Sequence, residues 1–80
     1  MTKFYINFRH GNEIAKDDEG IDLPSLADAR QVAFTSAREL VAENIKEASN
    51  TPLEAVIITD ENGKELMTIP ARDVLPEPLK

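Results

Sequence analysis

The chain of 80 residues contains no cysteine, no tryptophan, one histidine and three glycines. Without cysteine, the protein can form neither disulfide bonds nor thiolate metal sites. No glycine-rich loop follows a predicted strand, so the sequence contains no phosphate-binding loop. The histidine, His10, lies in a predicted turn, where the sequence supplies no partner to orient it as a general base. We therefore predict that the protein is not an enzyme and holds no cofactor and no metal ion.

Basic residues are also few. Nine lysines and arginines stand against fifteen acidic residues, which gives a net charge of −6. This sign argues against nucleic acid, because lysine and arginine supply most of the affinity for phosphates. No apolar run approaches the roughly 18 residues that span a membrane, and residues 1–20 lack the apolar core of a signal peptide. We expect a cytoplasmic protein that binds neither nucleic acid nor membranes.

The first third of the chain alternates between apolar and polar residues. Phe4, Ile6 and Phe8 fall on one side of a predicted strand, and Tyr5, Asn7 and Arg9 fall on the other. This period of two predicts a half-buried strand. A turn over residues 10–12 leads into a short strand over residues 13–16, and a three-residue loop would place Phe8 opposite Ile14. After an acidic turn, residues 21–23 form a further extended segment before Pro24.

A long helix follows. Ser25 and Asp28 have the spacing of a capping box, and neither glycine nor proline interrupts the chain from residue 26 to about residue 48. The predicted apolar stripe consists of Leu26, Ala29, Ala33, Phe34, Ala37, Leu40, Val41, Ile45 and Ala48. Arg30 and Asn44 fall inside this stripe and need either partners or a position at its edge, whereas Val32 falls outside it.

The strongest local signal is a hairpin with strands over residues 55–60 and 65–69. Two registers are open. A two-residue turn at Asn62-Gly63 pairs Ile58 with Met67 and Val56 with Ile69. A type I turn that begins at Asp60, with Gly63 in the left-handed region, pairs Ile58 with Leu66. Aspartate at the first turn position and glycine at the fourth favour the second register.

The order of these elements predicts an α+β domain. An antiparallel sheet of about four strands, in the order β-β-α-β-β, would carry one long helix packed across one face. Residues 1–75 form a single domain, and residues 76–80 form a flexible tail. A helix of about 36 Å is longer than strands of about 20 Å. An apolar overhang at Val41, Ile45 and Ala48 would therefore need cover from the C-terminal residues or from a second chain.

Two features are candidate partner-binding sites. The predicted sheet leaves Tyr5 exposed beside Asn7 and Arg9, where it forms an apolar patch with Ile57. Another candidate is an acidic ridge on the helix, made of Glu39, Glu43 and Glu47. The acidic turn with Asp17, Asp18, Glu19 and Asp22 either is solvated or binds a cation weakly, although its spacing does not match a calcium loop.

Several turn and cap motifs occur together along the chain. They are Phe4-Tyr-Ile-Asn-Phe-Arg-His-Gly11, Asp18-Glu-Gly-Ile-Asp-Leu-Pro-Ser-Leu-Ala-Asp-Ala-Arg30, Thr59-Asp-Glu-Asn-Gly63 and Leu66-Met-Thr-Ile-Pro70. In these motifs the chain resembles a family of small proteins of unknown function that is common in rhizobia and related alphaproteobacteria. The resemblance implies a stand-alone bacterial cytoplasmic domain without an assigned activity, and it transfers no catalytic residue.

A second resemblance covers residues 17–45. The acidic turn, Gly20 and the Leu-Pro-x-Leu entry into an alanine-rich helix are similar to the antitoxin domain that neutralises small RNA-cleaving toxins. This chain lacks the Gly-Cys loop of that domain and its separate DNA-binding tail.

We therefore expect a small non-catalytic domain that binds an unknown protein partner or forms a homodimer. One alternative is an antitoxin-like neutraliser of a basic ribonuclease, with a gene for that enzyme nearby. The other is a weak binder of a divalent cation or small ligand at the turn over residues 17–22.

Overall fold

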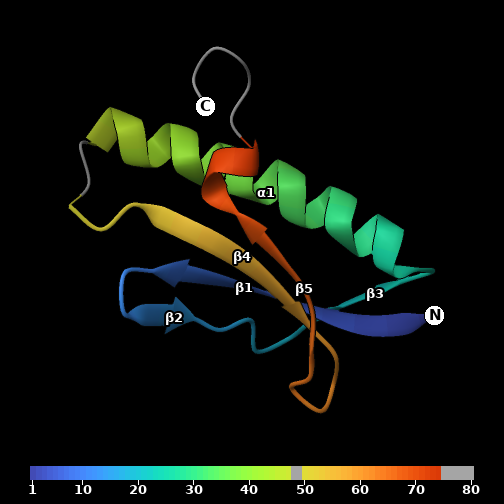
Figure 1. Ribbon diagram of the computed structural model, residues 1–80. Helices are drawn as coiled ribbons and strands as arrows, with labels where there is room; N and C mark the ends of the chain where they lie inside the picture. Colours follow the sequence, from blue (N-terminus) through green and yellow to red (C-terminus); the bar gives the residue numbers. More distant parts are fainter. Residues whose placement is uncertain (48–49, 75–80) are drawn as a thin grey trace.

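The computed structural model describes residues 1–47 and 50–74, except for the side chain of Glu47. Its elements in chain order are the strands β1 Thr2–His10, β2 Glu13–Ala15 and β3 Ile21–Leu23, the helix α1 Leu26–Glu47, the strands β4 Leu53–Thr59 and β5 Glu65–Pro70, and the short 3₁₀ helix η1 Ala71–Val74. All strand pairs are antiparallel, and α1 lies across one face of the sheet (Figure 1). The predicted α+β architecture is confirmed. The tail predicted over residues 76–80 lies outside the described residues.

The sheet is centred on β1 and β4, with the order β2-β1-β4-β5. β3 also pairs with β1, so the sheet has five strands, one more than the predicted number. β2 pairs with the end of β1 and β3 pairs with its beginning. Residues 13–23 therefore run back along β1 as one interrupted strand, and the acidic loop over residues 16–20 lies opposite the middle of β1.

The register of the first hairpin differs from the prediction. The loop contains two residues, and Gly11 adopts a positive φ of 61°. Phe8 consequently lies opposite Ala15, and Ile14 lies opposite Arg9. Because a shift of one residue moves a side chain to the other face, Ile14 lies on the face of the sheet without the helix, where it is 49% exposed.

The second hairpin combines features of both predicted registers. Its turn is the four-residue form that begins at Asp60: the Gly63 N–H donates to the Asp60 carbonyl over 3.0 Å, and φ of Gly63 is 83°. However, the predicted pairing of Ile58 with Leu66 is wrong, since Ile58 pairs with Met67. A bulge at Leu66 adds one residue to β5 and shifts the register beyond Thr59.

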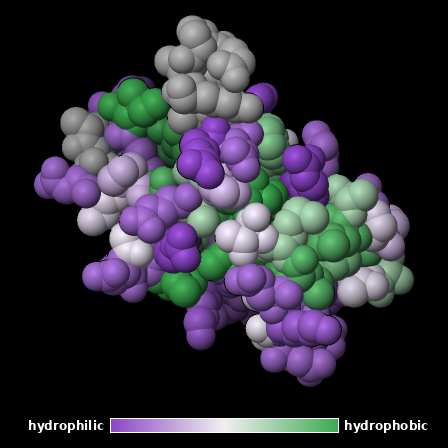
Figure 2. Space-filling model, in the orientation of Figure 1, coloured by the Kyte–Doolittle hydropathy of each residue, from purple (hydrophilic) through white to green (hydrophobic). Residues whose placement is uncertain are grey.

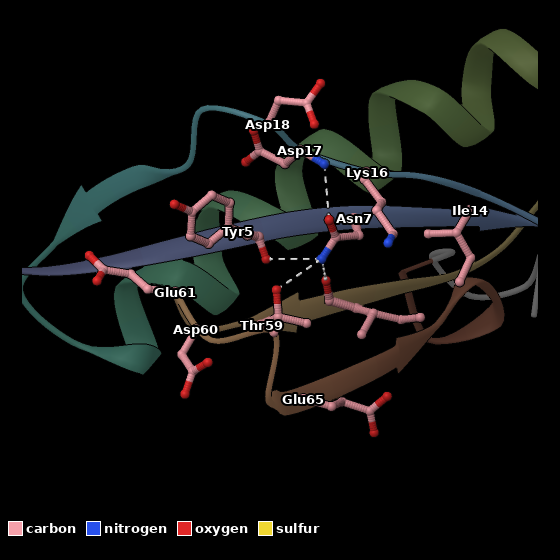
Figure 3. Close-up of a pocket in the computed structure, with 12 residues that line it drawn as sticks. Tyr5, Asn7, Ile14, Lys16, Asp17, Asp18, Thr59, Asp60, Glu61 and Glu65 are labelled. Atoms are coloured by element: carbon pink, nitrogen blue, oxygen red, sulfur yellow. Dashed lines mark hydrogen bonds between the residues drawn. The ribbon is translucent and has the colours of Figure 1, made fainter.

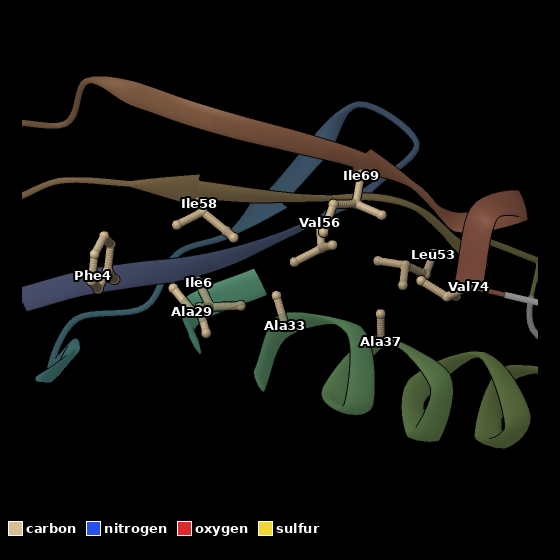
Figure 4. Packing of buried hydrophobic residues seen from close by; sticks show 10 residues of the cluster. All are labelled: Phe4, Ile6, Ala29, Ala33, Ala37, Leu53, Val56, Ile58, Ile69 and Val74. Atoms are coloured by element: carbon tan, nitrogen blue, oxygen red, sulfur yellow. The ribbon is translucent and has the colours of Figure 1, made fainter. Parts of the chain in front are cut away.

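The core lies between α1 and the sheet (Figure 4). Ala29, Ala33 and Ala37 are completely buried on α1, and their small side chains let the helix approach the strands closely. Opposite them lie the buried sheet residues Phe4, Ile6, Leu53, Val56, Ile58 and Ile69, and Val74 of η1 completes the cluster. The predicted apolar stripe of the helix is thus largely confirmed. Val32, predicted outside the stripe, also packs against the core.

Polar contacts fix both ends of α1. At its start, Ser25 Oγ accepts a hydrogen bond from the Asp28 N–H, and the hydroxyl donates to Asp28 Oδ2 over 2.8 Å, as the capping pattern predicts. Near its end, Asn44 Oδ1 accepts from the Leu53 N–H over 2.9 Å, which joins the helix to β4. Beyond this point Ile45 is 67% exposed, whereas Val41, also predicted in the overhang, packs against the core. Ala48, the last residue of that predicted overhang, lies outside the described residues.

On α1, two arginine side chains stack on Phe34, which itself packs against the core. The guanidinium groups of Arg30 and Arg38 lie 5.4 and 4.9 Å from the centre of the Phe34 ring. Arg38 Nε also donates to the Val74 carbonyl over 2.9 Å and so holds η1 against the helix. Arg30, for which the helix pattern predicted a partner or an edge position, is exposed and lies over the Phe34 ring.

Candidate functional site

The face of the sheet opposite α1 is the candidate site. In β1 the side chains of alternate residues point to opposite faces, so Tyr5 and Asn7 point away from the helix. The register pairs Tyr5 with Thr59 and Asn7 with Ile57. Figure 3 shows Tyr5, Asn7 and Thr59 in front of the sheet, with α1 behind it, and Ile57 lines the same surface. We call this surface the helix-free face.

A depression of about 370 Å³ lies on the helix-free face. Tyr5, Ile14 and Ile57 supply its apolar lining, together with the polar residues Asn7 and Thr59. Asn7 lies between Tyr5 and Ile14 in Figure 3. Its charged lining consists of Lys16 and five acidic residues, Asp17, Asp18, Asp60, Glu61 and Glu65. The depression therefore combines an apolar floor with a strongly acidic rim.

Asn7 forms the fixed centre of the depression. It is only 7% exposed, although the sequence pattern predicted an open position. Its Nδ2 donates to the Ile57 carbonyl over 3.0 Å and to Thr59 Oγ1 over 3.2 Å. Its Oδ1 accepts from the Asp17 N–H over 2.9 Å. Because a buried amide is costly unless it is hydrogen-bonded, this network ties β1, β4 and the acidic loop into one unit.

Asp17 holds the acidic loop against β1. Its Oδ2 accepts from the Ile6 N–H over 3.2 Å, and its Oδ1 accepts from the N–H groups of Glu19 and Gly20 over 3.1 and 3.0 Å. Burial raises the pKa of Asp17, but these three hydrogen bonds to Gly20, Ile6 and Glu19 outweigh burial and lower it below 3.8. The carboxylate thus replaces the strand partner that Ile6 lacks between β2 and β3.

This geometry bears on the cation hypothesis for the acidic turn. The Asp17 carboxylate faces backbone N–H groups, while Asp18, Glu19 and Asp22 are exposed. Within residues 1–47 and 50–74, no three carboxylate or imidazole groups converge closely enough to hold a metal ion. The Asp17 carboxylate is instead used by backbone N–H groups of β1 and of the loop itself.

Gly20 fixes the position of the Tyr5 ring. Its φ is 72°, and a Cβ at this position would lie 3.0 Å from Tyr5 Cε2 and 2.8 Å from Lys3 Cγ. Only glycine combines this backbone conformation with so close a contact. The ring therefore lies against the acidic loop and is half-buried. The sequence pattern predicts an exposed ring, so this part of the prediction is wrong.

Charge is unevenly distributed around the depression. Asp18, Glu61 and Glu65 are exposed on its rim. Asp60 Oδ1, in contrast, accepts hydrogen bonds from the N–H groups of Asn62 and Lys64. In the space-filling view, hydrophilic residues cover the turn of the β4–β5 hairpin, and hydrophobic residues gather near β3 and the start of α1 (Figure 2). The hydrophilic turn supplies one side of the acidic rim.

The structure separates the residues that the sequence offered as binding candidates. Tyr5 and Ile57 meet in the depression, as predicted. Glu39 and Glu43 are exposed on α1, which covers the other face of the sheet, and the side chain of Glu47 is outside the described part. The acidic ridge and Tyr5 therefore do not form one site.

Sequence reasoning missed several contributors to the depression, among them Ile14, Glu61 and Glu65. Ile14 was assigned to the wrong face by the predicted loop length, and Glu65 lies at the bulge in β5. His10, at the end of β1, has a partner that the sequence did not reveal, since its Nδ1 lies 3.2 Å from the Thr51 carbonyl oxygen. This contact holds the imidazole to the chain that enters β4.

None of the helices in the described part of the chain is both long enough and apolar enough to cross a membrane.

Comparison with known proteins gives a family and no further match. No curated protein and no solved structure matched this chain. A sequence family described as a domain of unknown function, DUF6894, matches residues 3–72. The predicted resemblance to a family of unknown function is confirmed at this level, while an alphaproteobacterial origin stays a prediction. Since the match extends from β1 into η1, the chain belongs to the DUF6894 family.

Proposed function

We propose that this protein is a non-catalytic protein-binding module and that the helix-free face is its binding surface. The proposal rests on one observation, which is that the two faces of the sheet differ in what covers them. One face is covered by α1, while the other presents Tyr5, Ile14 and Ile57 in one depression. A concave surface with apolar anchors and a polar rim is typical of protein contacts.

Rigidity of this face supports binding. Gly20 limits the position of Tyr5, and hydrogen bonds to both neighbouring segments hold Asn7. A surface that is already ordered loses little side-chain entropy when a partner docks. These contacts leave the depression accessible to a partner, because Ile14 remains 49% exposed.

The edges of the sheet are less suited to binding than this face. An edge strand recruits a partner strand when it is long, flat and regular. β5 contains a bulge at Leu66 and ends in Pro70, which cannot donate a backbone hydrogen bond. β2 and β3 contain three residues each. We therefore favour docking on the face over addition of a strand.

Self-association through the same face is also less favourable. A twofold dimer places each patch against its own copy. Here the exposed carboxylates of Asp18, Glu61 and Glu65 would oppose one another, with Lys16 as the lone basic residue of the depression. The charge thus favours a different protein over the homodimer that we expected as the other possibility.

Site-specific photo-crosslinking in the native cell tests this proposal. A photoreactive residue is placed at Ile14 on the helix-free face and, as a matched control, at the exposed Gln31 on α1. We expect a discrete adduct with another protein from position 14 and none from position 31. Adducts from position 31 alone would contradict the proposal, and an adduct at twice the mass of the chain would support the homodimer instead.

The antitoxin-like alternative names one kind of partner for the same acidic surface. Its support is the resemblance over residues 17–45 and the net charge of −6, which suits a basic ribonuclease. It predicts a gene for a small basic ribonuclease beside the gene for this protein, and it predicts that the position-14 adduct contains that enzyme.

A further inference from the structure

We propose that the depression recognises a basic, extended segment of its partner and receives a lysine or arginine side chain beside Tyr5. This inference rests on the proposed function and deepens it, because it assigns the chemistry of the partner. It depends on three observations, which are the charge of the rim, the apolar floor and the arrangement of the carboxylates.

The depression concentrates the negative charge of the protein. Its lining contains five acidic residues and Lys16, an excess of four negative charges, whereas the whole chain carries a net charge of −6. Low-dielectric walls around charges of one sign focus their field and attract ligands of the opposite charge. The surface therefore favours a cationic partner over an acidic protein or a nucleic acid.

The apolar floor selects a side chain rather than a free ion. Lysine and arginine bury their aliphatic stems along apolar surface while their charged ends remain near water. Ile57 and Ile14 offer such a surface, and Tyr5 adds an aromatic ring. A cation within about 6 Å of a ring centre is attracted by the ring. The protein itself contains this pairing on α1, where two arginines lie over Phe34.

The carboxylates are arranged around the depression instead of at one point. Asp18 comes from the acidic loop, Glu61 from the turn of the second hairpin and Glu65 from the start of β5. Within the described chain no three of them converge on a metal position. Separate charges spread around the rim of the depression match a segment that carries several basic residues.

The sequence provides a reporter at this position. Tyr5 is the only tyrosine, and the chain contains no tryptophan, so tyrosine fluorescence reports on this side chain alone. We would titrate the full chain with a synthetic peptide in which lysine and threonine alternate, and with a control peptide in which glutamate replaces lysine. We expect a saturable change in Tyr5 emission with the lysine peptide and none with the glutamate peptide.

Salt and charge variants distinguish specific recognition from general attraction. Raising the salt concentration to about 0.3 M should weaken the affinity for the lysine–threonine peptide by roughly tenfold, because exposed charges are screened at that ionic strength. The double variant Glu61→Gln/Glu65→Gln should weaken it by roughly tenfold. The matched variant Glu39→Gln/Glu43→Gln removes the same charge from α1 and should leave the affinity within about twofold.

A separate variant measures how much the Tyr5 ring contributes to the affinity for the lysine–threonine peptide. Tyr5→Leu keeps the charges and most of the apolar surface, so the affinity measured by calorimetry should fall by roughly threefold to fivefold. Equal binding of both peptides, or equal losses in the two double variants, would overturn the inference. If adducts still formed at position 14 in that case, the proposed function would survive without a basic partner. If adducts formed only at position 31, the proposed function itself would fail.

Discussion

The two faces of the sheet are built from the same strands and differ in what holds them together. Ile6 and Ile58 pair on the face under α1, where they are 8% and 0% exposed. Their neighbours Tyr5, Asn7 and Ile57 point the other way and are joined by hydrogen bonds instead of a covering helix. The face under α1 is buried and held by apolar packing, while the helix-free face is held by hydrogen bonds and stays accessible. Under the proposed function, alternate residues of β1 and β4 would serve folding and binding separately.

The acidic loop makes this division possible. Between β2 and β3 it replaces strand pairing with the Asp17 carboxylate and supports Asn7 and Tyr5 from one side. Hydrogen bonds thereby order the helix-free face without a second layer of secondary structure. The acidic loop is thus part of the scaffold, and a second carboxylate of this loop, Asp18, belongs to the rim.

The largest expected effect contrasts two neighbours in β4. Ile58→Ala should lower the free energy of unfolding by about 3 kcal/mol, because it leaves a cavity in a completely buried cluster. Ile57→Ala should lower it by less than about 1 kcal/mol, since Ile57 is half-buried on the open face. Urea denaturation of both variants measures the difference. Equal losses would show that the helix-free face also contributes a core.

Asn7→Ala should have the next largest effect. It removes the acceptor of the Asp17 N–H and leaves the Ile57 carbonyl without its amide donor. We expect a loss of about 2 kcal/mol in the free energy of unfolding, together with faster amide exchange at Asp17. Retained stability would show that water replaces the asparagine amide at little cost.

The glycine contact separates backbone strain from side-chain crowding. Gly20→Ala adds a methyl group against Lys3 and Tyr5 at a positive φ, and we expect a loss of about 2 kcal/mol. Gly11→Ala meets nothing within 4 Å at a similar φ, so about 1 kcal/mol should be lost. Thermal unfolding of the pair gives the difference. If both variants lost the same amount, the crowding of Tyr5 by Gly20 would carry no energy.

The smallest expected effect concerns acid. Because the pKa of Asp17 is lower in the folded protein than its usual 3.8, the unfolded chain takes up the proton more readily. The contribution of Asp17 to stability is therefore complete above pH 3.8 and is lost as the pH falls through the folded-state pKa. Asp17→Asn should reduce the neutral-pH stability by about 1 kcal/mol and make the acid dependence shallower. An unchanged slope of stability against pH would contradict this assignment.

Local patterns in the sequence predicted most of the fold. Alternation assigned Phe4 and Ile6 to the core, the Ser25 cap marked the start of α1, and Asp60 and Gly63 marked the second turn. Each of these signals depends on residues within a few positions of one another. The antiparallel sheet under a single helix followed from their order.

Both errors in register came from single-residue effects. A loop of two residues instead of three moved Ile14 to the helix-free face, and a bulge at Leu66 changed the partner of Ile58. Neither change alters the pattern of apolar residues along the strand concerned. In both hairpins, the register is determined only by how the strand pairs with its neighbour.

The candidate site was only partly predictable for a related reason. Tyr5 and Ile57 were recognised as apolar residues that point away from the helix. The burial of Asn7 depends on Asp17 and on the backbone of Ile57, which is fifty positions away. Nothing local to Asn7 indicates such partners, so the sequence pattern assigned it to solvent.

Assignment of the amide resonances during titration with the lysine–threonine peptide tests the division between the two faces most directly. We predict that the largest shifts fall on Tyr5, Asn7, Ile57 and Thr59, with the amides of α1 around Glu39 and Glu43 nearly unmoved. Shifts centred on α1, or spread evenly over both layers, would contradict the assignment of binding to the helix-free face.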